Sequence, residues 1–183
     1  MASLQNRIIG AMTLQVSTFE EVEHDTTAMG QAALIVTLAA VSSGISWILW
    51  SGPGGIIRGA ISALIGWVIG AVVVWAIGTK LLPGPKTQAD IGQVMRTVGF
   101  AQAPGLLSFV AIIPILGVFI SLVIWVWTLI AWVIAVRSAL DYENDTMRAV
   151  IVCVLAFVAI FIVTAVVGLM FGAGALMSGA LRS

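Results

Sequence analysis

Charged residues are scarce in this chain of 183 residues, since only 9% are Asp, Glu, Lys or Arg. Eight basic residues balance eight acidic ones, so the net charge is zero. Without a basic surplus the chain lacks the positive field that attracts nucleic acid. Without an acidic surplus it also lacks the negative field that attracts basic partners. Nucleic acid is therefore not expected as a partner.

Residue types that perform catalysis or bind metals are also few. The chain has one cysteine, Cys153, within an apolar run, and one histidine, His24, among acidic residues. A lone cysteine excludes an internal disulfide and has no second ligand at metal-site spacing. No nucleophile and base, and no pair of carboxylates, has a spacing that suits a catalytic site. The sequence thus predicts no enzyme, no catalytic residue, no metal and no cofactor.

Hydrophobic residues, in contrast, make up 61% of the chain, and the mean hydropathy is +1.15. These values indicate an integral membrane protein. About 20 apolar residues cross the hydrocarbon, and one of the four long runs, from Gly99 to Val136, is long enough for two crossings folded at Pro114 to Gly117. We therefore predict an all-α bundle with five spans, at about 28–50, 56–77, 99–114, 117–137 and 149–171.

The distribution of Lys and Arg predicts the orientation of these spans. With five crossings, residues 1–26 and the two loops around 80–96 and 137–148 share one side, which carries six of the eight basic residues; the other side carries Arg58 and Arg182. Basic residues concentrate on the cytoplasmic side. The amino terminus is therefore expected in the cytoplasm and the carboxyl terminus outside, with 1–26 as a cytoplasmic region and 27–183 as the membrane domain.

Two segments outside the spans have helical amphipathicity. Apolar residues recur every three or four positions from Leu4 to Phe19, which predicts one helix lying on the membrane surface. The acidic residues at 20–25 then form a solvated linker; the alternative is that their carboxylates hold a cation. A second surface helix is predicted over 88–98, capped by Thr87 and Asp90, with Arg96 on its polar face.

The stretch GFAQAPGLL, residues 99–107, predicts a hinge between that surface helix and the third span. Pro104 has no amide hydrogen and its ring crowds the preceding turn, while Gly99 and Gly105 relieve crowding at the bend. Gln102 lies where the freed carbonyl and the interface offer partners. The alternative is that Gln102 lines a conduction path, because polar residues within membranes are often functional.

A seam of small residues, Ser62, Gly66 and Gly70, recurs every four positions in the second span. This spacing puts the three residues on one helix face and permits close helix approach. Packing within the chain is the simpler interpretation, and contact with another protein is the alternative.

Several motifs resemble the Yip (Ypt/Rab-interacting protein) domain family. They are the Gly99 to Leu107 bend, the Ile-Pro-x-Leu-Gly of 113–117, a Trp-containing span ending in Ala-x-Arg-x-Ala at 135–139, and Arg148-Ala149 at the last span. The resemblance implies five spans and a cytoplasmic amino terminus. Eukaryotic members associate with Rab-type small GTPases through a long amino-terminal region. Only about 26 residues precede the first span here, so the chain is more similar to short prokaryotic members, and no GTPase partner is expected.

The predicted spans carry no ionisable residue near their centres, whereas transporters commonly place such groups there. We therefore expect a multi-pass scaffold or accessory subunit of the cell membrane that associates with lipid and other membrane proteins. A transporter or channel for small solutes or ions is the alternative.

Overall fold

The computed structural model describes residues 2–46, 48, 52–113, 115–142 and 145–180, and these contain helices and connecting turns with no strand among them. The end of the first predicted span (residues 47 and 49–50), Pro114 and Arg182 lie outside the described residues. The helices are α1 (Leu4–Met12), α2 (Val16–His24), η1 (Thr26–Ala28), α3 (Met29–Ser46), α5 (Pro53–Ala76), η2 (Ile77–Leu81), α6 (Ile91–Phe100), η3 (Ala103–Ile112), α7 (Leu116–Ala139) and α8 (Thr146–Ala180).

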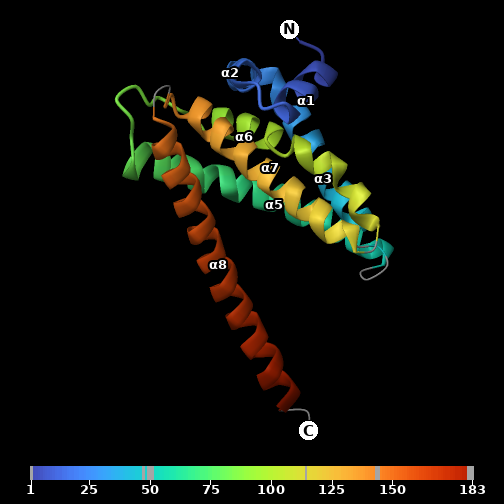
Figure 1. Ribbon diagram of the computed structural model, residues 1–183. Helices are drawn as coiled ribbons and strands as arrows, with labels where there is room; N and C mark the ends of the chain where they lie inside the picture. Colours follow the sequence, from blue (N-terminus) through green and yellow to red (C-terminus); the bar gives the residue numbers. More distant parts are fainter. Residues whose placement is uncertain (1, 47, 49–51, 114, 143–144, 181–183) are drawn as a thin grey trace.

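Four helical stretches are long and apolar enough to cross a membrane: Thr26–Ser46, Pro53–Leu81, Leu116–Ala139 and Thr146–Val166. They correspond to the first, second, fourth and fifth predicted spans. The all-helical membrane class is therefore confirmed. The helix α3 packs on α5, and η3 packs on both α3 and α7. Figure 1 shows α8 leaving the bundle at an angle.

Residues 99–114, predicted as one span, divide between the end of α6 and the 3-10 helix η3. Pro104 has no amide hydrogen and cannot donate to the carbonyl four residues earlier. The chain uses three-residue hydrogen bonds instead: Gln102 N–H donates to the Gly99 carbonyl at 3.2 Å, and Gly105 N–H donates to the Gln102 carbonyl at 2.9 Å. Pro104 therefore marks a change of helix type.

The predicted single helix from Leu4 to Phe19 is wrong, because the chain turns after Met12. Leu14 adopts a left-handed conformation with φ 61°, and α2 begins at Val16. A β-carbon at Gly10 would clash with the Thr18 hydroxyl, so α2 folds closely back on α1. The turn lets Phe19, which is fully buried, pack into the protein core rather than into lipid.

The second amphipathic helix also differs from its prediction. It begins at Ile91, and its cap is the reciprocal pair Asp90 and Gln93 rather than Thr87 and Asp90. The helix α6 is not on the outside of the bundle: it packs against α2, α3, α5 and α7, and its Val94 and Val98 are fully buried. Its apolar stripe is therefore covered by protein rather than by lipid.

At each end of the bundle, side-chain hydrogen bonds join neighbouring segments. At one end Ser42 Oγ donates to the Leu106 carbonyl at 2.9 Å, which attaches α3 to η3. At the other end Tyr142 OH donates to the Leu82 carbonyl at 2.6 Å, and Thr87 Oγ1 donates to the Leu140 carbonyl at 2.8 Å. The segments before α6 and after α7 therefore lie together, and the end of η3 lies beside the end of α3.

Candidate functional site

A cavity of about 470 Å³ lies among α3, α5, η3 and α7. We call it the interhelical cavity. Trp67, Trp125 and Trp132 line it together with small and aliphatic side chains. The polar lining residues are Ser43, Ser46, Gln102, Ser108, Ser121 and Thr128. An apolar pocket with a few convergent polar groups is typical of small-molecule sites, whose volumes run from roughly 300 to 1,000 Å³.

The polar groups of the interhelical cavity differ in whether they have a hydrogen-bond partner within the protein. Thr128 Oγ1 donates to the Ile124 carbonyl at 2.8 Å, and Ser46 Oγ donates to the Ser108 carbonyl. The Gln102 carboxamide, in contrast, has no hydrogen-bond partner within the part of the chain that the structure describes, and it is partly accessible from the cavity. Because an unpaired amide in hydrocarbon is costly, Gln102 is the group best placed to bond to an occupant.

Of the helices that surround the interhelical cavity, some pack closely on one another and one pair leaves a gap. The helix α3 packs on both α5 and η3, and η3 packs on α7, whereas α5 and α7 make no extensive direct contact along their described residues. At Gly70, a β-carbon would lie 3.4 Å from the Trp132 ring and 3.8 Å from Ile160 of α8, so this end is closed. At Gly66, one turn away, a β-carbon would meet nothing within 4 Å. The gap between α5 and α7 is therefore open beside Gly66.

The predicted small-residue seam lies along this gap. Gly70 is buried against α7 and α8, Gly66 lines the cavity, and Ser62 is exposed. Its use by another protein stays a prediction.

The predicted hinge residues lie against α3. A β-carbon at Gly99 would be 2.7 Å from the Ala32 β-carbon, and one at Gly105 would be 3.1 Å from the Ala39 β-carbon. Pro104 is buried between them. Gln102 lies on the wall of the interhelical cavity, while hinge motion and a conduction path lined by Gln102 both stay predictions.

Sequence reasoning missed the convergence of the cavity's hydroxyl groups. They come from α3, η3 and α7, and no spacing along the chain shows that these three helices face a common space. The one available signal was the polar Gln102 in an apolar run.

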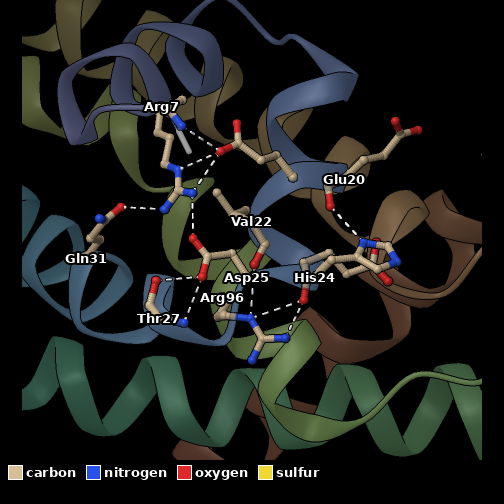
Figure 2. A network of polar contacts seen from close by, with 11 residues as sticks. Arg7, Glu20, Val22, His24, Asp25, Thr27, Gln31 and Arg96 are labelled. Carbon is tan, nitrogen blue, oxygen red and sulfur yellow. Dashed lines mark hydrogen bonds and ion pairs between the residues drawn. The ribbon is translucent and has the colours of Figure 1, made fainter.

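A second group of polar residues, the N-terminal polar cluster, joins α1, α2, α3 and α6 (Figure 2). Arg7 is only 2% exposed. Its Nη2 lies 2.6 Å from Asp25 Oδ2 and 2.8 Å from Glu21 Oε1, and its Nη1 donates to Gln31 Oε1 at 2.9 Å. The hydrogen bond from the Thr27 hydroxyl, together with that from Arg7, lowers the pKa of Asp25 to about 2. The acidic segment predicted to be solvated is thus partly held in ion pairs.

Arg96 attaches α6 to the end of α2, rather than lying on a solvated face as predicted. It is 5% exposed, and its Nε donates to the Val22 carbonyl at 3.0 Å (Figure 2). Its Nη2 donates to the Glu23 carbonyl. These carbonyls lie at the carboxyl end of α2, where a helix attracts cations.

Glu23 is 3% exposed, and burial raises the pKa of its carboxyl group to about 7. Gln93 Nε2 donates to Glu23 Oε1 at 3.3 Å. The other charged or titratable groups that act on it are His24, Asp141, Glu20 and Arg96. Among the residues that the structure describes, no group of three His, Cys, Asp or Glu side chains is arranged to hold a metal ion. The cluster joins the N-terminal helices to the bundle.

Comparison with known protein families gives one match. The family described as Yip1 domain matches residues 9–167, which include every residue lining the interhelical cavity and most of the N-terminal polar cluster. The chain belongs to the Yip1 domain family. The predicted resemblance is thereby confirmed, and this Yip1 domain protein is a multi-pass membrane protein. No curated protein and no solved structure matches the chain.

Proposed function

We propose that this Yip1 domain protein is a scaffold or accessory subunit that associates with other membrane proteins and catalyses no reaction itself. The main support for this proposal is that α8 packs on the bundle only along its first turns. Its first turns pack on the bundle through buried residues, among them Ala149 and Val152, but no side chain from Phe157 to Val166 is buried. Figure 1 shows this helix diverging from α5 and α7.

The diverging part of α8 offers an apolar face suited to a partner's transmembrane helix. Val158, Phe161 and Ile162, spaced three and four positions apart on one face, are 49%, 74% and 55% exposed. Helices associate in lipid by van der Waals packing, so the stretch of α8 beyond its contacts with the bundle is available for a helix of another protein.

A photo-crosslinking experiment tests this proposal in the native membrane. A photoreactive residue at position 161 should form adducts with a discrete membrane protein that also copurifies with the unmodified chain after mild solubilisation. The matched control is position 57, because Ile57 of α5 is also exposed, at 67%, but lies on a helix that stays in the bundle. Lipid adducts alone at both positions would contradict the scaffold role.

We propose further that α6 and η3 together make the third of five crossings. Ten residues of α6 and ten of η3 give about 35 Å at about 1.5 and 2.0 Å per residue, against about 30 Å of hydrocarbon. The segment also begins near the Tyr142 end of the bundle and ends beside Ser42 and Ser46 of α3.

Together with five crossings, the bias of Lys and Arg supports our proposal that the protein lies in the plasma membrane with its amino terminus in the cytoplasm. A reporter active only outside the cell should be active after Ser183 and inactive when inserted near Asn144. With the amino terminus in the cytoplasm, the reverse pattern would mean that α6 and η3 do not cross, and equal activity at the two positions would mean that α8 does not cross.

Transport of a small solute or ion is the second candidate function, and the interhelical cavity favours it. The two candidates differ in what the isolated protein does. We expect purified protein in lipid vesicles to move no ions or small solutes, whereas robust flux that depends on the protein would replace the scaffold role with transport.

A further inference from the structure

We propose that the interhelical cavity binds an uncharged lipid whose head group carries hydroxyl or amide groups, as in a diacylglycerol or a ceramide, and that this lipid enters between α5 and α7. The inference goes beyond the scaffold role and does not depend on it. It rests on the chemistry of the lining, the position of the opening and the size of the cavity.

The lining selects an uncharged, hydrogen-bonding head group. None of the described residues that line the cavity is charged, so a phosphate or ammonium group that left water for the cavity would meet no opposite charge. Gln102 provides both a donor and an acceptor, and the nearby Ser43 and Ser121 hydroxyls provide more of each. A hydroxyl or amide head group satisfies these groups, whereas a purely apolar chain would leave the Gln102 carboxamide unpaired.

The opening favours a ligand that arrives from the bilayer. Because α5 and α7 are both long and apolar enough to span the membrane, the gap between them opens toward the bilayer. Space is open beside Gly66, whereas Trp132 and Ile160 fill it at Gly70. Trp67 and Trp125 line the interior, which suits the glycerol or sphingoid backbone and the first methylenes of a lipid. A cavity of about 470 Å³ accommodates that part of a lipid, while the remaining chains extend through the gap into the hydrocarbon.

The test uses full-length protein in phosphatidylcholine nanodiscs with a diacylglycerol that carries a diazirine close to its glycerol. Photolysis should label peptides of α3, η3 and α7, and excess unlabelled diacylglycerol should displace the label. Phosphatidic acid, which has the same chains and a charged head, should not displace it. Free glycerol should not displace it either, which distinguishes a lipid from a water-soluble polyol.

Two variants locate the site. Gly66→Leu places a side chain in the opening and should abolish displaceable labelling, while Gly59→Leu, on the same helix at another open position, should leave it unchanged. Gln102→Leu removes the carboxamide with little change in volume and should weaken competition by diacylglycerol about five- to tenfold. Melting temperatures of all variants are compared with that of the unmodified protein to identify misfolding.

Equal labelling of the Gly66→Leu variant and the unmodified protein would overturn the proposal, as would equal competition by phosphatidic acid. Competition by free glycerol alone would assign the cavity to a polyol instead. If Gly66→Leu does not fold, the competition series on the unmodified protein and Gln102→Leu decide the question.

Discussion

Replacement of Arg7 by alanine should loosen the attachment of both N-terminal helices to the bundle. The guanidinium group is almost fully buried and makes four hydrogen bonds, two to Glu21 and one each to Asp25 and Gln31. These partners belong to α2, to the turn before η1 and to α3. Arg7→Ala therefore removes hydrogen bonds to all three at once.

The expected loss of stability is about 2 to 3 kcal/mol. Removing one member of a buried ion pair costs roughly 3 to 5 kcal/mol, but Glu21 is 37% exposed and regains water, which reduces the cost. In a protein of this size, about 1 kcal/mol corresponds to roughly 2 to 4 °C in melting temperature. We therefore expect Arg7→Ala to melt about 5 to 10 °C lower than the unmodified protein.

The measurement is thermal unfolding in detergent, followed by the fluorescence of the tryptophans. Arg58→Ala is the control, because Arg58 is exposed near the start of α5, at the opposite end of the bundle. Arg7→Lys should recover part of the loss, since lysine keeps the charge without the planar fork that bonds several partners. If Arg7→Ala melts within 1 °C of Arg58→Ala, the network contributes nothing measurable and the reasoning fails.

Three further predictions concern other contacts. Because burial raises the pKa of Glu23 from 4.5 to about 7, the folded protein keeps a proton that the unfolded chain releases, so stability should fall as pH rises across that interval; Glu23→Gln should remove this slope in melting curves at pH 5 and pH 8. Tyr142→Phe loses hydrogen bonds to the end of the α5 and η2 segment and should lower stability by about 1 kcal/mol in the same melting assay. Gly99→Ala should lower the melting temperature because its β-carbon would be 2.7 Å from that of Ala32, whereas Gly30→Ala, with nothing within 4 Å, should leave it unchanged or raise it.

Local chemistry explains which features of the fold were predictable. The scarcity of charge and the long apolar runs dictate a helical membrane protein, because only satisfied backbones persist in hydrocarbon. The missing amide of Pro104 dictates a change in hydrogen bonding near residue 102, and Asp90 dictates a helix start. Each of these features depends on residues within a few positions of one another.

The surroundings of each amphipathic face depended on the tertiary structure. Periodicity predicts which residues share a helix face, but it does not distinguish a face covered by lipid from one covered by protein. Periodicity therefore predicts a surface helix at 88–98, whereas Val94 and Val98 of α6 are buried among four other helices.

The amino-acid sequence by itself determined that the protein lies in a membrane, that it is helical, where most of its spans are and which family it belongs to. The tertiary structure alone decided which distant groups meet: Arg96 with the Val22 carbonyl 74 residues away, and Gln102 with the hydroxyls of α3 and α7 around one cavity. The physical reason is that hydropathy and helix propensity act over one or two turns. A cavity or a buried ion pair arises only when helices from separate parts of the chain pack, and its polar groups are left with each other, or with a ligand, as partners.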